Sequence, residues 1–116
     1  MHNYKELKIW QKAIELAEKV YQSTQGFPSD ERFGLTSQLR RASVSVSSNI
    51  AEGAGRNTKG EFNQMLGIAY GSLCEIETQL IIAKRLELLN MEMFEVLTSE
   101  IDQLQKMIFN LKKSLK

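Results

Sequence analysis

Apolar residues recur along the chain at alternating steps of three and four, which is the spacing of amphipathic helices. The pattern is clearest in two rows of seven positions each, both without a gap. The first row consists of Phe62, Leu66, Ala69, Leu73, Ile76, Leu80 and Ala83, and the second of Phe94, Leu97, Ile101, Leu104, Ile108, Leu111 and Leu115. These rows predict one helix over about residues 59–87 and another over about residues 91–115.

Two further helices are predicted in the first half of the chain. Over about residues 6–24 the main apolar row is accompanied by a second row, which widens the apolar face. The main row consists of Leu7, Trp10, Ile14, Ala17 and Tyr21, and the second of Ile9, Ala13, Leu16 and Val20. Over about residues 31–54 the row consists of Leu35, Leu39, Ala42, Val46, Asn49 and Gly53. Because this row holds few large side chains and four serines lie between Ser43 and Ser48, packing must hold the helix, and neighbours can approach it closely.

Residues that stop or cap helices mark the joints. Gly26 and Pro28 end the first helix. Thr58 and Glu61 form a capping-box pattern, in which each side chain satisfies a free backbone amide of the other residue. Asn90 caps the last helix. Four amphipathic helices with short joints predict an all-α chain with a single domain over residues 1–116, folded as an antiparallel up-and-down four-helix bundle.

Composition agrees with one globular domain that carries no targeting segment. Apolar residues make up 42% of the 116 residues and charged residues 25%. The net charge of +1 shows no overall attraction to nucleic acid or membranes, so such affinity must come from local clusters. Early lysines interrupt any signal-peptide pattern and no apolar run spans a bilayer, so a cytoplasmic location is expected.

Residues for catalysis or metal binding are scarce. Helical bundles often hold di-iron sites, which need several glutamates and two Glu-x-x-His pairs. The only histidine, His2, precedes every predicted helix, and Glu52, Glu75 and Glu77 alone make a poor metal site. Cys74 has no histidine to activate it and is interpreted as a small core residue. We therefore expect no enzyme activity, no metal and no cofactor.

Asn49 is the one polar residue within an apolar row. We interpret it as a buried amide that pairs with a neighbouring side chain, such as Glu77, and fixes helix register. This interpretation is preferred to a ligand-binding role.

Basic residues cluster on the second helix and at the joint that follows it. The candidate nucleic-acid-binding residues are Arg40, Arg41, Arg56 and Lys59. There is no acid between Phe33 and Ala51, the stretch that contains Arg40 and Arg41. Lysine and arginine gathered on one face would bind phosphates. An equally weighted interpretation pairs the two central arginines with acids of the same chain, such as Glu52 or Glu75.

The last helix adds four lysines and has no acid after Asp102. They are Lys106, Lys112, Lys113 and Lys116. Lysines at a helix C-terminus favour the helix dipole, which is the simpler interpretation of this tail.

An apolar outer face on the second helix suggests self-association. Phe33, Ser37, Val44 and Ala51 lie roughly opposite the predicted core row and form the candidate oligomer interface. Ile81 and Ile82 add apolar surface on the third helix. Scattered surface apolar residues are normal, but a symmetric homo-oligomer is the commonest way to cover such a face.

Several segments together resemble the four-helix proteins of the 23S ribosomal RNA intervening sequences. These segments are Leu7-x-x-Trp10-Gln11-Lys12-Ala13, Phe27-Pro28, Gly34-Leu35-x-x-Gln38-Leu39-Arg40-Arg41-Ala42, Asn49-Ile50-Ala51-Glu52-Gly53 with Arg56, and Glu75-x-Glu77-x-x-Leu80-x-x-Ala83. The resemblance implies a bacterial four-helix bundle that assembles into a ring-like homopentamer. It also implies a relationship to the accessory protein of diversity-generating retroelements, a basic pentameric barrel thought to bind nucleic acid and a reverse transcriptase. By this likeness Arg40, Arg41 and Arg56 are candidate nucleic-acid contacts.

Two functional hypotheses follow. The first is a non-enzymatic oligomer that binds structured RNA through its backbone phosphates. The second is a homo-oligomeric scaffold that binds a protein partner, with the arginines at subunit interfaces. The position of Arg40 and Arg41, facing either open solvent or acids across an interface, discriminates between the two.

Overall fold

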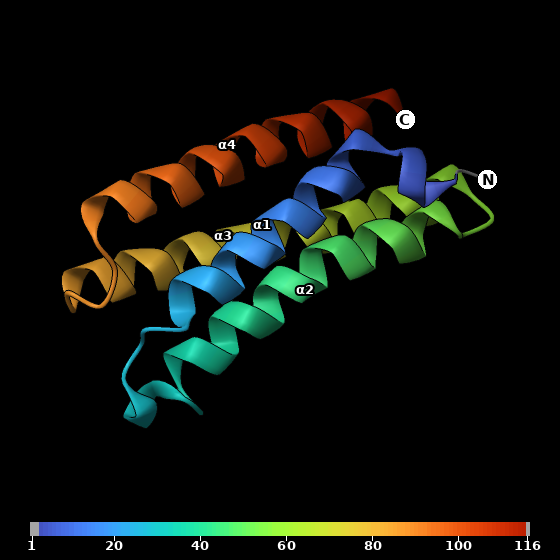
Figure 1. Cartoon of the computed structure of the whole chain (residues 1–116). Helices are drawn as coiled ribbons and strands as arrows, with labels where there is room; N and C mark the ends of the chain where they lie inside the picture. Colours follow the sequence, from blue (N-terminus) through green and yellow to red (C-terminus); the bar gives the residue numbers. More distant parts are fainter. Residues whose placement is uncertain (1–2, 116) are drawn as a thin grey trace.

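The computed structural model describes residues 3–115 and shows four α-helices (Figure 1). These are α1 (Lys8–Thr24), α2 (Leu35–Ala54), α3 (Lys59–Arg85) and α4 (Met91–Ser114). Short 3-10 turns at Tyr4–Glu6 (η1) and Ser29–Glu31 (η2) precede α1 and α2. Residues 3–115 contain no strand, so the predicted all-α four-helix fold is confirmed. Helix α2 begins at Leu35 rather than at about residue 31, because η2 and a further turn occupy the preceding residues.

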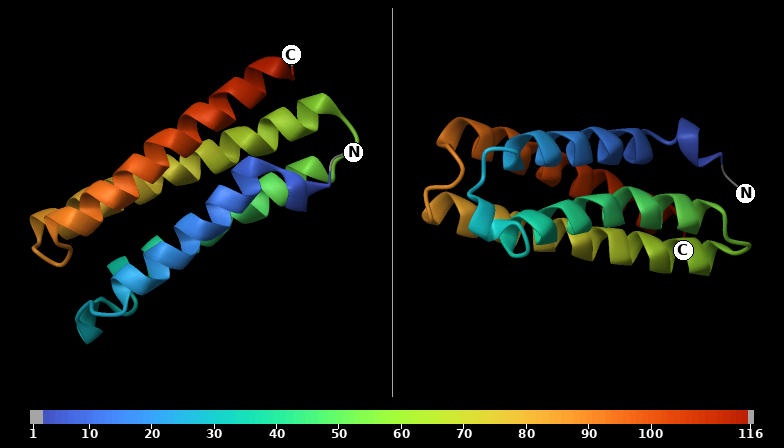
Figure 2. Two further views of the ribbon diagram at one scale, coloured as in Figure 1. Left: turned by 45° about the horizontal axis from the view of Figure 1, so that its top comes forward. Right: turned by 60° about the horizontal axis from the view of Figure 1, so that its bottom comes forward.

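Helices that follow one another in the chain are neighbours in the bundle. α1 contacts α2, α2 contacts α3, α3 contacts α4, and α4 closes the bundle against α1. Figures 1 and 2 show both chain ends at the same end of the bundle as the α2–α3 turn, with the other two turns at the opposite end. His2 was predicted to precede every helix, and Lys116 to belong to the lysine-rich tail. Both lie outside the described residues.

The core is formed by fully buried aliphatic residues of all four helices. They include Leu16 and Val20 of α1, Leu39 and Ile50 of α2, Leu66, Leu73, Ile76 and Leu80 of α3, and Leu97, Ile101, Leu104 and Ile108 of α4. Each such side chain stabilises the fold by about 1.5–3 kcal/mol relative to its exposed state. The two predicted seven-residue rows supply most of these positions. In the row of α4 the outer members Phe94, Leu111 and Leu115 are half-buried, whereas the row of α3 is buried from Phe62 to Ala83.

On α1 the second apolar row, and not the main one, faces the bundle axis. Ile9, Ala13, Leu16 and Val20 are buried, whereas the main row is half-buried and Tyr21 is 42% exposed. The two rows were predicted to form one wide apolar face, and the structure places the second row at its buried centre and the main row at its edge. Both rows are equally apolar, and the positions of α2 and α4 decide which of them becomes buried. The main row lies at the edge of α1 that borders α2.

Small residues bring α2 and α3 into direct contact. A Cβ atom added to Gly53 would lie 2.7 Å from the Cβ of Met65 and 3.0 Å from Cδ1 of Phe62. The hydroxyls of Ser45 and Ser72 are 3.0 Å apart across the same contact. The predicted close approach of a neighbouring helix is thus confirmed at this side of α2.

Buried serines of α2 cost little because their hydroxyls are satisfied within the helix. Ser43 donates to the carbonyl of Arg40 at 2.8 Å, and Ser47 donates to the carbonyl of Val44 at 3.1 Å. Such bonds remove the penalty of an unpaired polar group without requiring a partner on another helix.

Asn49 is half-buried and pairs within α2. Its Nδ2 donates to the carbonyl oxygen of Ser45 at 2.8 Å and lies 2.9 Å from the Ser45 hydroxyl. Because that hydroxyl is also hydrogen-bonded to Ser72, the amide supports the α2–α3 contact. The predicted partner Glu77 was wrong: it lies one turn from Cys74, on the side of α3 that faces α4.

Candidate functional site

Arg40 connects α2 to the C-terminal end of α1. Its Nε donates to the Thr24 hydroxyl at 2.9 Å and its Nη2 to the carbonyl of Tyr21 at 3.3 Å. The guanidinium also lies 4.7 Å from the centre of the Tyr21 ring. α1 has no basic residue in its last turn, so Arg40 supplies the positive charge that the free carbonyls of a helix C-terminus favour.

This position decides how Arg40 is paired in the monomer. The expectation of an intramolecular partner is met, but the partners are neutral oxygens of α1 rather than the carboxylates of Glu52 or Glu75. No residue pattern indicated these partners, because a helix C-terminus attracts a cation through backbone groups that are the same for every residue type.

Arg41 and Lys59 are exposed and differ from Arg40 in having no internal partner. Within residues 3–115 neither side chain makes a hydrogen bond, an ion pair or a contact with an aromatic ring. Arg41 lies on the outer face of α2, and Lys59 is the first residue of α3. These two cations are therefore open to an external anion.

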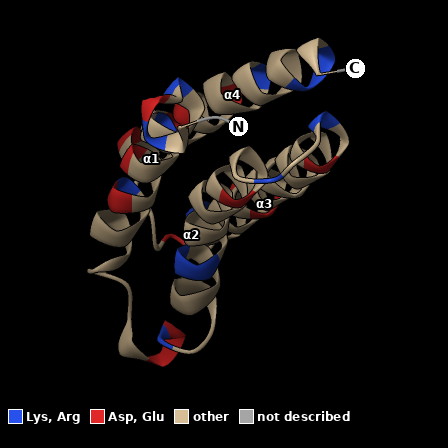
Figure 3. Cartoon of the chain, turned by 90° about the vertical axis from the view of Figure 1, so that its right-hand side faces the viewer, with Lys and Arg blue, Asp and Glu red and all other residues tan. Residues whose placement is uncertain are grey.

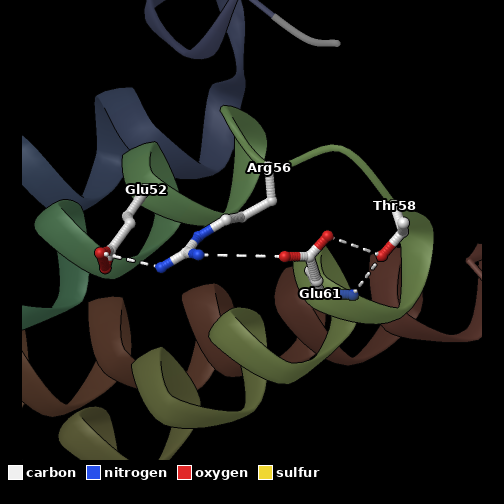
Figure 4. A network of polar contacts seen from close by, with 4 residues as sticks. All are labelled: Glu52, Arg56, Thr58 and Glu61. Atoms are coloured by element: carbon white, nitrogen blue, oxygen red, sulfur yellow. Dashed lines mark hydrogen bonds and ion pairs between the residues drawn. The ribbon is translucent and has the colours of Figure 1, made fainter.

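Arg56 is the centre of a small polar network at the α2–α3 turn (Figure 4). Its guanidinium lies 3.3 Å from Glu52 and 3.9 Å from Glu61. The Thr58 hydroxyl accepts from the amide of Glu61 at 3.1 Å and donates to the Glu61 carboxylate at 3.0 Å. The capping box is therefore only half as predicted, since the Glu61 carboxylate contacts the Thr58 hydroxyl and not its amide. All three charged side chains are largely exposed, so each ion pair contributes at most about 1 kcal/mol.

The four predicted nucleic-acid contacts do not form one patch. Arg41 and Arg56 lie about 20 Å apart along the chain direction of α2, since a helix rises about 1.5 Å per residue. Arg40 is occupied by α1, and Arg56 is flanked by two acids. The nucleic-acid role of all four residues stays a prediction, and Arg41 and Lys59 are the two best placed for it.

The lysines of α4 have three different environments. Lys112 donates to the carbonyl and to Oδ1 of Asn63, at 2.9 and 3.1 Å. Its ammonium lies beside Gly67, where an added Cβ would be 3.4 Å away. Lys106 pairs with Asp102 at 3.0 Å, and Lys113 lies 5.6 Å from the ring centre of Phe109. Lys112 therefore links α4 to α3, a role that sequence reasoning missed although the absence of a side chain at Gly67 makes the space for it.

The predicted oligomer interface lies partly in a shallow groove between α1 and α2. The groove, called here the α1–α2 groove, is lined by Ile14, Ala17, Glu18, Tyr21, Gln22, Val44 and Ser47. Val44 is 43% exposed, and Phe33, in the turn before α2, is 89% exposed. Ser37 and Ala51 are half-buried on the same helix. Ile81 and Ile82 of α3 are also partly exposed, and neither lines this groove.

A second groove runs between the first half of α3 and the second half of α4. This α3–α4 groove is lined by Tyr70, Asp102, Gln105, Lys106, Phe109 and Asn110. Phe109 is 54% exposed. The sequence analysis did not identify Phe109 as a candidate residue, because it lies beside the apolar row of α4 and not in it.

The acidic residues and the single cysteine are the described side chains whose chemistry suits a metal ion. No group of three His, Cys, Asp or Glu residues suited to a metal ion occurs among residues 3–115. Cys74 is exposed, and its Sγ accepts from Gln105 Nε2 at 3.7 Å, so its interpretation as a core residue was wrong. Within the same residues, no helix has the length and apolar character needed to cross a membrane.

The chain is similar to known proteins over nearly its whole length. The family model described as 23S rRNA-intervening sequence protein matches residues 5–110. A solved structure with the same fold is a protein of unknown function from the S23 ribosomal protein family of Bacteroides thetaiotaomicron. It is 22% identical with a TM-score of 0.84, and the match covers 90% of this chain and 95% of that chain. The comparison with curated proteins gave no match.

Proposed function

The chain belongs to the family of 23S rRNA-intervening sequence proteins, and we propose that it acts as a non-enzymatic scaffold assembled from copies of itself. The assembly is a closed ring of identical subunits in the cytoplasm, with the five-fold stoichiometry that the family resemblance implied. The observation that carries this proposal is the α1–α2 groove, whose apolar residues the helices of one chain leave partly uncovered.

The groove offers an apolar surface without a strong charge. Ile14, Ala17, Tyr21 and Val44 line it, and the only ionisable acid or base among its lining residues besides Tyr21 is Glu18. A second copy that covers these residues removes apolar area from water, which is the main driving force of association. Phe33, in the turn before α2, is almost wholly exposed and offers further apolar area for such a contact to bury.

A ring also requires a second surface that differs from the first. Rings with more than two subunits use head-to-tail contacts, in which one patch of each subunit meets a different patch of the next. The outer row of α3 supplies such a patch, since Ile68 is 47% and Ile82 44% exposed. α1 and α3 are not in contact within the bundle, so the two patches lie on different faces.

A charge placed in the groove tests the proposal. Val44→Glu brings a carboxylate into the interface, and we expect the assembly to dissociate to monomers while helix content is retained. Val96→Glu is the matched control, because Val96 on α4 is 41% exposed and outside both patches. Light scattering after size-exclusion chromatography measures the assembly size. A wild type that is monomeric, or a Val44→Glu variant that assembles like the wild type, contradicts the proposal.

Nucleic-acid binding is a second candidate function, supported by the open positions of Arg41 and Lys59. Both are exposed and free of internal acids, and a ring multiplies a weak local site by the number of subunits. Binding through phosphates gives an affinity that falls steeply with salt.

The salt dependence provides the test for this second function. Arg41→Gln/Lys59→Gln is compared with Lys8→Gln/Arg85→Gln, which has the same net charge and also changes exposed residues. We expect only the first variant to bind structured RNA more weakly than the wild type. A plot of the logarithm of its binding constant against the logarithm of the salt concentration should also be shallower, by about 0.7–0.9 for each phosphate that the variant no longer neutralises. Equal behaviour of the two variants would remove Arg41 and Lys59 from the function.

A further inference from the structure

We propose that the α3–α4 groove binds single-stranded nucleic acid, with an unpaired base stacked on Phe109. This inference rests on the nucleic-acid candidate above and deepens it, since it names the strand type and a groove that neither Arg41 nor Lys59 lines. The groove also lies outside the α1–α2 groove, so both can be occupied at once.

Phe109 is placed as a stacking platform. It is 54% exposed on α4, although the helix buries four other apolar residues at neighbouring turns. The half-buried ring of Tyr70 lines the same groove from α3. Exposed aromatic rings bind unpaired bases of any sequence, because every base has a flat face to stack.

The charges around Phe109 favour a polyanion. Residues 62–74 of α3 contain no charged side chain, and no acid follows Asp102 on α4. Asp102 itself is paired with Lys106 at 3.0 Å, which reduces its repulsion of a phosphate. The Lys113 ammonium lies over one face of the Phe109 ring, 5.6 Å from the ring centre. A base stacked on the other face therefore brings its phosphate within reach of this ammonium.

Phe33 shows why an exposed aromatic residue alone is not sufficient. It too has a cation beside its ring, since the Arg32 guanidinium lies 5.6 Å from the ring centre. However, Asp30 and Glu31 precede it in η2, so this turn carries more acids than bases. Figure 3 shows acidic and basic segments together at the η2 turn, whereas the C-terminal end of α4 is basic.

The groove favours single strands over duplexes and over apolar partners. Bases of a duplex are stacked inside the helix and cannot reach a ring on a protein surface, so only an unpaired base fits Phe109. The amides of Gln105 and Asn110 beside the ring provide hydrogen-bonding groups for base edges, which an apolar helix or a lipid would leave unpaired.

Binding of labelled oligonucleotides by wild type and two matched variants tests the proposal. The probes are oligo(dT) and oligo(U) of about 16 nucleotides, long enough for a single-strand site, and a duplex of the same length. Fluorescence anisotropy at low salt measures the dissociation constants, after size and helix content of each variant have been verified. We expect the wild type to prefer the single strands and Phe109→Ala to bind them about tenfold more weakly. Val96→Ala, at a 41% exposed position of the same helix outside both proposed subunit contacts, is expected to bind like the wild type.

Phe109→Trp provides a second readout that does not depend on loss of function. A stacked base quenches indole fluorescence, so we expect quenching by oligo(dT) beyond that seen for Trp10 of the wild type. The proposal is overturned if the wild type binds no single strand, or if Val96→Ala and Phe109→Ala lose affinity equally. It is also overturned if duplex binding depends on Arg41 and Lys59 but no binding depends on Phe109, a result that leaves the phosphate-binding candidate intact.

Discussion

The two sides of α2 differ in how completely neighbouring helices cover them. Toward α3, Gly53 lies against Met65 and the Ser45 hydroxyl is bonded to that of Ser72. Toward α1, Val44 stays 43% exposed at the edge of a groove. Small side chains occur on both sides of the helix. Small side chains therefore permit a helix to pack closely against α2. Close packing occurs only on the side where α3 lies.

The side that stays open is also the side that a polar contact holds in place. Arg40 binds the end of α1 through Thr24 and Tyr21, which fixes one end of the α1–α2 contact without closing the groove along its length. The α3 side of α2 therefore stabilises the fold of the single chain. The α1 side leaves apolar surface available to another molecule.

A large side chain at Gly53 is expected to have the largest effect on the monomer. Gly53→Leu places atoms where Met65 and Phe62 already lie, so we expect the free energy of unfolding to fall by about 3 kcal/mol. Ala51→Leu, at a half-buried position on the same row of α2 as Val44, is expected to change it by less than about 1 kcal/mol. Urea denaturation followed by circular dichroism measures both. Similar losses in the two variants would mean that the two sides of α2 do not differ.

Removal of the Arg40 side chain is expected to have an intermediate effect. Arg40→Ala leaves the carbonyl of Tyr21 and the Thr24 hydroxyl without their charged donor, and we expect a loss of about 1–2 kcal/mol in the free energy of unfolding. Arg41→Ala removes an exposed side chain and is expected to change it by less than about 0.5 kcal/mol. Denaturation of the two neighbouring variants under identical conditions makes the comparison. An equal effect at both positions would show that the contact with α1 does not stabilise the bundle.

The smallest effect is expected at a glycine that touches nothing. Nothing lies within 4 Å of a Cβ added to Gly71, in contrast to Gly53. Gly71→Ala restricts the unfolded chain and adds helix propensity, so we expect the free energy of unfolding to rise by about 0.5–1 kcal/mol. The thermal midpoint provides the measurement. The comparison is made in the monomeric Val44→Glu background, where no second subunit covers the outer row of α3. A loss of stability there would mean that the added methyl group contacts another part of the same chain.

Periodicity alone was sufficient for the helices and for most of the core. The rows from Phe62 to Ala83 and from Phe94 to Leu115 each have one strongly apolar face, which determines the buried side. On α1 the rows that contain Ile14 and Leu16 are about equally apolar. The choice between them depends on where α2 and α4 lie, which a single helix pattern does not specify.

The polar contacts were harder to predict than the core. Arg40 and Lys112 bind backbone and side-chain oxygens of other helices, and such partners leave no mark in the sequence near the cation. Cys74 was placed in the core on residue type, although its position on α3 is exposed. The ring assembly, the link to retroelement accessory proteins and the nucleic-acid contacts depend on other molecules and stay predictions.

The order of the helices has a consequence for how fast the chain reaches its fold. Because consecutive helices are neighbours, most contacts join residues that are close in sequence, which favours rapid folding with a low entropic cost of loop closure. The α2–α3 hairpin, with its short turn and tight packing, is the natural nucleus. The α1–α4 contact joins the most distant segments and is expected to form last. Changes at Gly53 should therefore slow folding, whereas changes between α1 and α4 should mainly accelerate unfolding.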